Sequence, residues 1–220
     1  MLRLLFSILF ATLTVFGTFI ALRLPFVAKG MPPLPDAEEI IRAGGVIFGS
    51  YRYSLQIPAV WLSGILLGPF WGLISQAIFL LLGLFCLPIF LEGGGFGYLS
   101  QPTFGFLFAF LPAAWIVGKL RGQGGFKRTW FALATAQLFV DLVGSLGVAL
   151  HEGFHPGLWW TAFHQSIQLL PGQLILITAL AGFVVPFDFV LFLLKSKEAK
   201  ENRENKENSR DRESREPIKG

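Results

Sequence analysis

His151, Glu152 and His155 have the spacing of a zinc site. They read His-Glu-Gly-Phe-His, which matches the pattern in which two histidines one helical turn apart hold zinc and the glutamate activates water. His164 could supply a third ligand. The pattern requires a helix, but Gly153 interrupts it. A membrane zinc protease is therefore an alternative interpretation, and a polar loop at the membrane interface, without metal, is favoured.

Asp141 is an ionisable residue inside the long apolar segment 129–150. Because a charged side chain is costly within a membrane, such a residue is a candidate for a functional site. Two roles stay open for it. It could anchor a polar solute, or it could be an internal hydrogen-bond partner of a residue such as Gln137.

A glycine-rich segment from Glu92 to Pro102 precedes the apolar run that starts at Thr103. Glycines such as Gly94 and Gly95 let backbone amides approach a ligand closely, and a helix start presents free N–H groups. The alternative is a flexible turn between two membrane spans. The sequence contains no G-x-x-x-x-G-K-[ST] motif, so the chain shows no means of its own to hydrolyse ATP.

The composition indicates an integral membrane protein. Of the 220 residues, 53% are hydrophobic and only 15% are charged, whereas soluble domains carry about 25% charged residues. The formal net charge is +4, but nine of the 18 Lys and Arg residues lie in residues 195–220 together with seven acids. This mixture predicts a solvated tail and no nucleic-acid partner. The single cysteine, Cys86, lies in an apolar run and is predicted to be a buried, inert thiol.

The apolar runs predict an all-α membrane protein with six transmembrane helices in one bundle. A tight turn at Gly68-Pro69 separates a short second helix from a full third one, and a short helical stretch is expected over 36–42. Residues 1–194 form the predicted transmembrane domain, and residues 195–220 form a disordered cytoplasmic tail. The predicted spans are 4–24, 57–67, 71–90, 103–118, 129–150 and 167–194.

The charges also predict an orientation in the plasma membrane of a prokaryotic-type cell. The linker from Lys119 to Arg128 holds four basic residues and no acid, and basic loops mark the cytoplasmic side. With six spans, both termini share that side. The segments 25–54, 91–102 and 151–166 then face outward.

Six short motifs follow one another along the chain. They are Ser54-Leu55-Gln56, Leu66-Leu67-Gly68-Pro69, Leu87-Pro88-Ile89-Phe90, Gly93-Gly94-Gly95, Pro102-Thr103-Phe104-Gly105-Phe106 and Leu170-Pro171-Gly172. In their order and spacing they resemble the BioY family, the biotin-specific substrate-binding subunits of energy-coupling factor transporters. The resemblance covers residues 50–120 and resumes at the sixth span. It implies a six-helix bundle that binds biotin or a similar small vitamin near its outer face, with no cofactor and no covalent chemistry. It also implies three partners, a transmembrane coupling subunit and two ATPase subunits.

The sequence departs from the family where a vitamin's polar ends would be held. The family's Pro-Gly-Asp-x-x-Lys reads Pro171-Gly172-Gln173-Leu174-Ile175-Leu176, so the acid and the amine are both replaced. Gln173 could still bond a ureido group, and Arg52 could supply the missing positive charge. A divergent member with another ligand, or with a scaffold role, is the alternative.

The resemblance and the residue chemistry together define nine candidate contacts. Two are hydrogen-bonding groups, two are aromatic surfaces, two are backbone donors and three are polar anchors. In that order they are Gln56 and Thr103, Tyr98 and Phe106, Gly94 and Gly95, and Arg52, Asp141 and Gln173. Small-residue pairs in the first span, Ser7/Ala11 and Gly17/Ala21, suit either internal packing or, by the resemblance, docking of the coupling subunit.

Overall fold

The computed structural model describes the chain except for residues 30–37, 91–92, 123, 152, 154–155 and 187–220. Residues Met1–Ala181 form one compact unit. The second unit, Gly182–Gly220, is described only as far as residue 186. The predicted tail, 195–220, therefore lies outside the described residues.

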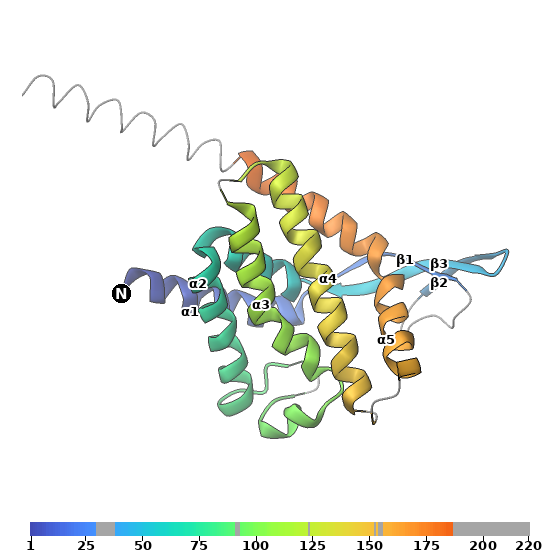
Figure 1. The fold of residues 1–220 in the computed structure, drawn as a ribbon, viewed down its shortest axis with the longest axis horizontal. Helices are drawn as coiled ribbons and strands as arrows, with labels where there is room; N and C mark the ends of the chain where they lie inside the picture. The colour runs from blue at the N-terminus through green and yellow to red at the C-terminus, as the bar shows by residue number, and fades with distance from the viewer. Residues whose placement is uncertain (30–37, 91–92, 123, 152, 154–155, 187–220) are drawn as a thin grey trace, which may run out of the picture. The chain divides into compact units, whose positions relative to one another are not determined.

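The first apolar run forms helix α1 (Leu2–Phe19), and three antiparallel strands follow it (Figure 1). The strands are β1 (Ala21–Lys29), β2 (Glu38–Ala43) and β3 (Val46–Ser54), in the spatial order β1-β3-β2. The predicted first span, 4–24, was thus too long. The helix predicted over 36–42 was wrong for residues 38–42, which belong to β2, and residues 36 and 37 lie outside the described residues. Gly44 and Gly45, at φ 57° and 76°, form the tight hairpin turn that pairs β2 with β3.

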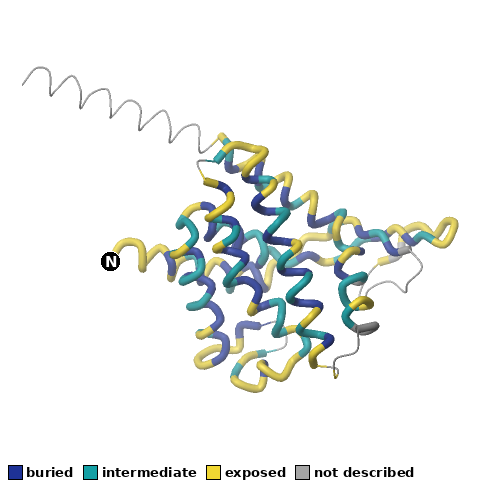
Figure 2. Tube along the Cα trace, in the orientation of Figure 1, coloured by how far each residue is buried: buried dark blue, intermediate teal, exposed yellow. Residues whose placement is uncertain are grey.

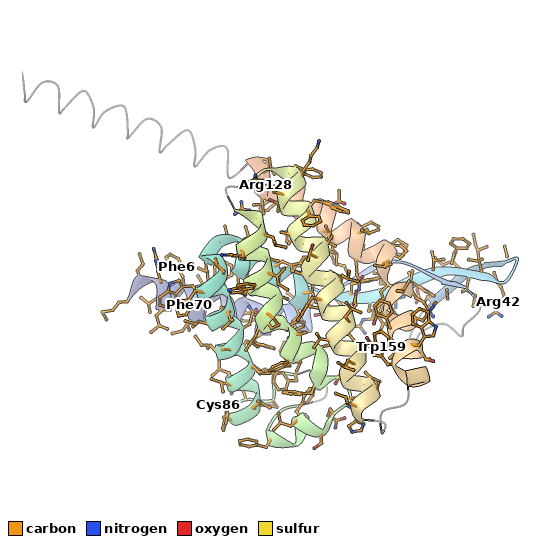
Figure 3. All side chains as sticks on the ribbon, in the orientation of Figure 1. Phe6, Arg42, Phe70, Cys86, Arg128 and Trp159 are labelled. Carbon is orange, nitrogen blue, oxygen red and sulfur yellow. The ribbon has the colours of Figure 1, made fainter. Side chains whose placement is uncertain are left out.

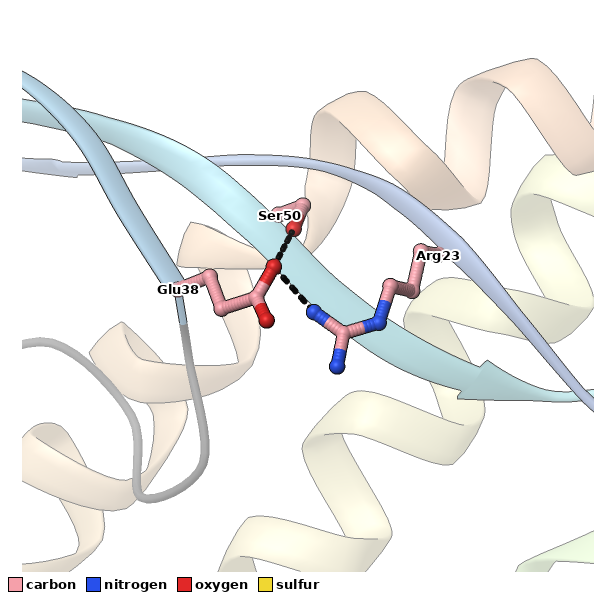
Figure 4. Close-up of polar contacts among 3 residues, drawn as sticks. All are labelled: Arg23, Glu38 and Ser50. Carbon is pink, nitrogen blue, oxygen red and sulfur yellow. Dashed lines mark hydrogen bonds and ion pairs between the residues drawn. The ribbon is translucent and has the colours of Figure 1, made fainter.

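The sheet has one packed face and an ion pair across its central strand. Phe26, Ala28 and Ile47 are buried together. Arg23 on β1 reaches across β3 to pair with Glu38 on β2, and Ser50 of β3 donates a hydrogen bond to the same carboxylate over 3.3 Å (Figure 4). This exposed pair stabilises the sheet by only about 1 kcal/mol or less, so the buried face contributes more.

Helix α2 (Gln56–Phe85) is two helices joined at a kink, as predicted for the turn at Gly68-Pro69. Gly68 has φ 80° and ψ 179°, outside the helical region. Pro69 has no N–H to donate to the carbonyl of Ile65, four residues earlier. The buried Arg121 replaces it, donating from Nη1 to that carbonyl oxygen over 3.0 Å. A cation at the end of the first half-helix also complements the helix dipole.

We expect Arg121→Met to lower the free energy of unfolding by about 1–3 kcal/mol, because the Ile65 carbonyl would be left buried without a donor. Thermal unfolding in detergent measures the change. Lys119→Met, on the same helix turn but exposed, is the control and should leave Tm within experimental error. Equal melting temperatures for the two variants would contradict this role for Arg121.

The remaining helices are α3 (Phe104–Arg121), α4 (Phe126–His151) and α5 (Pro156–Gln168), with the short 3-10 helix η1 (Phe96–Ser100) before α3. A further helix, Leu170–Pro186, bends by 55° from α5. The loop predicted over 151–166 was wrong, since most of it is α5. Pro156 is the first residue of α5, a position where the missing N–H costs nothing.

Four described helices are long and apolar enough to cross a membrane, or five if α5 and Leu170–Pro186 count as one bent span. The mostly helical membrane class is therefore confirmed. The number differs from six because α2 joins two predicted spans and the last one is bent. The orientation of the termini stays a prediction. Figure 3 does show Arg128, the last residue of the basic linker, and Cys86, near the glycine-rich segment, at opposite ends of the bundle. Cys86 is exposed, against the prediction of a buried thiol.

The small-residue face of α1 packs inside the bundle. Ser7, Ala11 and Gly17 are buried, whereas most of the N-terminal half of α1 is exposed (Figure 2). A β-carbon on Gly17 would lie 2.7 Å from the carbonyl oxygen of Leu55. The sequence left open whether these small residues serve internal packing or docking of a coupling subunit, and the structure shows internal packing. Ala21 belongs to β1 and forms no helical pair with Gly17.

Candidate functional site

A cavity of about 150 Å³ lies where four elements meet. Its walls include Arg52 of β3, Trp61 of α2, Gln137 of α4, and Gln173 and Leu176 of the helix Leu170–Pro186. Two of the predicted anchors, Arg52 and Gln173, thus line one cavity although they are far apart in the sequence. A third, Asp141, lies directly behind this wall.

Asp141 holds two glutamine side chains of the cavity wall. Its Oδ1 accepts hydrogen bonds from Gln137 Nε2 over 3.0 Å and from Gln173 Nε2 over 3.3 Å. A carboxylate accepts only from the NH₂ end of each amide, so both carbonyl ends are left free. Gln137 Oε1 and Gln173 Oε1 are indeed buried without a partner among the described residues.

Trp61 brings one unpaired donor to the cavity wall. Trp61 is 1% exposed, and its indole Nε1–H has no acceptor among the described residues. Gln56, at the start of the same helix, also has a buried and unpaired Nε2, but it does not line the cavity. Each such group costs about 1–3 kcal/mol if it stays unsatisfied, and native proteins pair nearly all of them. The site therefore fits a small solute that carries both N–H and C=O groups.

Tyr53 of β3 connects the sheet with the bend between α5 and the helix Leu170–Pro186. Its phenol is 2.8 Å from the carbonyl oxygen of Leu169, to which it donates, and 3.2 Å from that of Pro25. Burial raises the pKa of the phenol, so Tyr53 remains a neutral donor. A β-carbon on Gly172 would lie 2.3 Å from the Tyr53 ring. Gly172 thus allows the helix to approach Tyr53, which places Gln173.

Arg52 is the charged residue of the cavity wall, and it is exposed. It stands opposite Arg23 in the β1–β3 pairing, and Arg23 is engaged with Glu38. No ion pair of Arg52 is found among the described residues. Its position therefore leaves a cation where the cavity meets solvent.

The other five predicted contacts do not line this cavity. The Tyr98 hydroxyl and the Thr103 hydroxyl are 3.1 Å apart, and the Tyr98 ring packs on Phe90 at 4.6 Å between centroids. Gly94 and Gly95 approach the end of α2, where Gly95 N–H donates to the Gly83 carbonyl over 2.8 Å. The ring of Phe106 covers Gly144 of α4. A role in binding for these five residues stays a prediction.

A larger cavity, of about 420 Å³, lies beside that group, between α3 and α4. Its wall is mainly apolar and includes Phe104, Phe108, Leu146 and Leu150. None of the buried side-chain atoms that lack partners belongs to its lining. The smaller cavity is therefore the candidate binding site in the described part of the chain.

Sequence reasoning missed Trp61 and Tyr53. Gln137 was considered only as a partner of Asp141. The four-residue spacing of Gln137 and Asp141 places them on one helix face, which is a usable signal. A lone tryptophan in an apolar run carries no comparable signal. Only the tertiary structure shows that Trp61 lines a cavity with residues of β3 and α4, and that its indole N–H lacks an acceptor among the described residues.

The structure does not provide the helix that a zinc motif requires. Helix α4 ends at His151, and Gly153 has φ 85°, which is not helical. His164 lies in α5, whereas Glu152 and His155 are outside the described residues. Among the described residues, no group of three metal-binding side chains is found.

The fold and the site define a multi-pass helical membrane protein with a cavity lined by polar and aromatic side chains. Its fold is similar to that of a solved protein described as the S-component for biotin from an ECF-type ABC transporter. The TM-score is 0.60 and the identity 22%, over 83% of this chain and 88% of that one. At this identity the likeness is one of fold.

This chain belongs to the BioY family, whose sequence model matches residues 1–190. The resemblance seen in the short motifs is thereby confirmed. A probable biotin transporter BioY of Lysinibacillus sphaericus is 37% identical over 112 residues, 51% of this chain and 45% of that protein. The biotin transporter BioY of Thermotoga maritima is 31% identical over 135 residues, 56% of this chain and 79% of that protein. The match thus spans less than half of the first relative.

Proposed function

We propose that this chain is the substrate-binding membrane subunit of a biotin uptake transporter. Biotin carries a ureido ring with two N–H donors that flank one C=O acceptor. The unpaired carbonyls of Gln137 and Gln173 suit the two N–H groups, and the Trp61 N–H suits the C=O. This match of donors and acceptors, in a member of the BioY family, is the observation that carries the proposal.

The subunit captures biotin from the outer face of the plasma membrane and catalyses no covalent reaction. The separation of the basic linker from the glycine-rich segment along the bundle supports an orientation with the linker in the cytoplasm (Figure 3). The sequence contains no ATP-binding motif of the Walker type. Energy therefore comes from a transmembrane coupling subunit with two ATPase subunits.

Equilibrium binding of labelled biotin to the purified protein in detergent tests the proposal. We expect saturable binding with a Kd in the micromolar range or tighter, which corresponds to about 8 kcal/mol or more. A Kd of millimolar or weaker would rule out biotin as the solute. A family member with another ligand, or a scaffold protein, would then account for the fold.

We expect Trp61→Phe to weaken biotin binding about tenfold, because the ligand carbonyl would lose one donor worth about 1.4 kcal/mol. The matched control is Trp130→Phe, which removes an indole N–H that bonds Thr178 instead, over 3.1 Å. The same binding assay compares the two variants. If both bind biotin like the unmodified protein, Trp61 does not contact the ureido group.

A further inference from the structure

The cavity matches the head of the proposed ligand better than the whole molecule. Its volume of about 150 Å³ is half or less of the roughly 300–1,000 Å³ typical of pockets that enclose a complete small ligand. The unpaired polar atoms of its wall, from Trp61, Gln137 and Gln173, all suit the compact ureido ring. An extended acid tail must therefore leave the cavity.

The charges of the cavity wall determine which groups could pair with the carboxylate of the ligand's tail. Apart from Arg52, the side chains of the wall are neutral, and the position three residues after Gln173 is the apolar Leu176. Asp141 does not line the cavity, because both of its glutamine partners stand between them. The described wall thus offers the carboxylate no buried cation. Arg52 meets it only at the exposed end.

We propose that this site selects the ureido head and accepts biotin derivatives in which the carboxylate has become an amide, including amides formed with a lysine side chain. The inference rests on the proposed function. An ion pair to an exposed arginine changes affinity by about fivefold at most. A buried ion pair that lost its partner would change affinity by several hundredfold. Because Arg52 is exposed, its ion pair with the carboxylate contributes little to affinity. The ureido head therefore contributes most of the binding energy.

Competition against labelled biotin, on the full-length protein in detergent, tests this specificity with three unlabelled ligands. They are biotin, biotin carboxamide, and a biotin methylated on one ureido nitrogen. We expect the carboxamide to bind within about fivefold of biotin. The methylated ligand should lose about 50-fold or more, because it removes one N–H and adds bulk against a glutamine carbonyl.

Arg52→Gln should bring the affinities for biotin and its carboxamide to equality. Arg23→Gln, which changes the neighbouring arginine already paired with Glu38, should leave their ratio unchanged. If biotin binds and the carboxamide binds more than 50-fold weaker, the inference is overturned and the proposed function stands. If neither ligand binds, both are overturned.

Discussion

Replacing Asp141 by leucine is expected to reduce biotin affinity by about 100-fold or more. Both glutamine amides are held by charge-assisted hydrogen bonds to this carboxylate, and each such bond contributes about 1.5–3 kcal/mol. Without the carboxylate, the amides can rotate and present N–H groups to the ligand's own N–H groups. The expected loss therefore comes from orientation, since Asp141 does not line the cavity.

A second measurement separates this positioning role from a role in folding. Leucine removes the desolvation cost of the buried carboxylate but leaves two buried glutamine NH₂ groups without an acceptor. These effects oppose each other, so we expect a small change in the Tm of Asp141→Leu while binding is lost. Thr135→Ala, on the same helix, removes only a hydroxyl bonded to the carbonyl of Phe131 and should leave binding intact. A parallel loss of Tm and affinity would indicate general destabilisation instead.

Asp141→Asn should lie between the unmodified protein and the leucine variant. Its amide oxygen can still accept from one glutamine, but its NH₂ group competes with the other. We expect about tenfold weaker biotin binding, equivalent to about 1.4 kcal/mol. Unchanged affinity in both Asp141 variants would show that the glutamine carbonyls are not held toward the ligand by this residue.

Substituting Gly172 by alanine is expected to destabilise the protein by about 1–3 kcal/mol and to weaken biotin binding in parallel. The new methyl group would lie 2.3 Å from the Tyr53 ring and 2.5 Å from its hydroxyl oxygen. Tyr53 is buried and hydrogen-bonded to the Leu169 carbonyl, so it cannot move away without losing that contact. Thermal unfolding and biotin binding measure the two effects.

A double-mutant cycle with Tyr53→Leu tests the proposed clash. If the alanine methyl acts through the Tyr53 ring, adding Gly172→Ala to Tyr53→Leu should cost clearly less than it does alone. Gly182→Ala, at an exposed position of the same helix, serves as the control and should not lower Tm. Strict additivity of Gly172→Ala and Tyr53→Leu would contradict the contact.

Several parts of the fold could be predicted from local sequence. The kink in α2 was predicted because proline lacks an N–H and glycine tolerates a positive φ, and both properties act within one turn. The hairpin of β2 and β3 was missed although its Gly-Gly turn was visible. Ile47 of β3 is buried with residues of β1, and Leu169, about 120 positions later in the chain, packs against this cluster. The hydropathy of the segment does not report that contact.

The candidate site was predicted in part. Asp141 was recognised because a carboxyl in an apolar span is costly, and Gln173 and Arg52 followed from the family resemblance. The meeting of Arg52 and Gln173 at one cavity depends on the Tyr53–Gly172 contact between the sheet and the last helix. The glycine-rich segment was predicted as a binding loop. In the structure, its backbone packs closely on the end of α2, where Gly95 N–H bonds the Gly83 carbonyl.

The sequence alone determined the membrane class, the family and the break at Gly68-Pro69. The membrane class follows from the hydrophobicity of single residues, and the family follows from the order of short motifs. The break follows from the backbone properties of glycine and proline. Only the tertiary structure decided that Trp61, Gln137 and Gln173 keep unpaired polar atoms around one cavity. Whether a buried N–H or C=O is satisfied depends on neighbours distant in sequence. It also depends on how the Asp141 carboxylate orients the side-chain amides of Gln137 and Gln173.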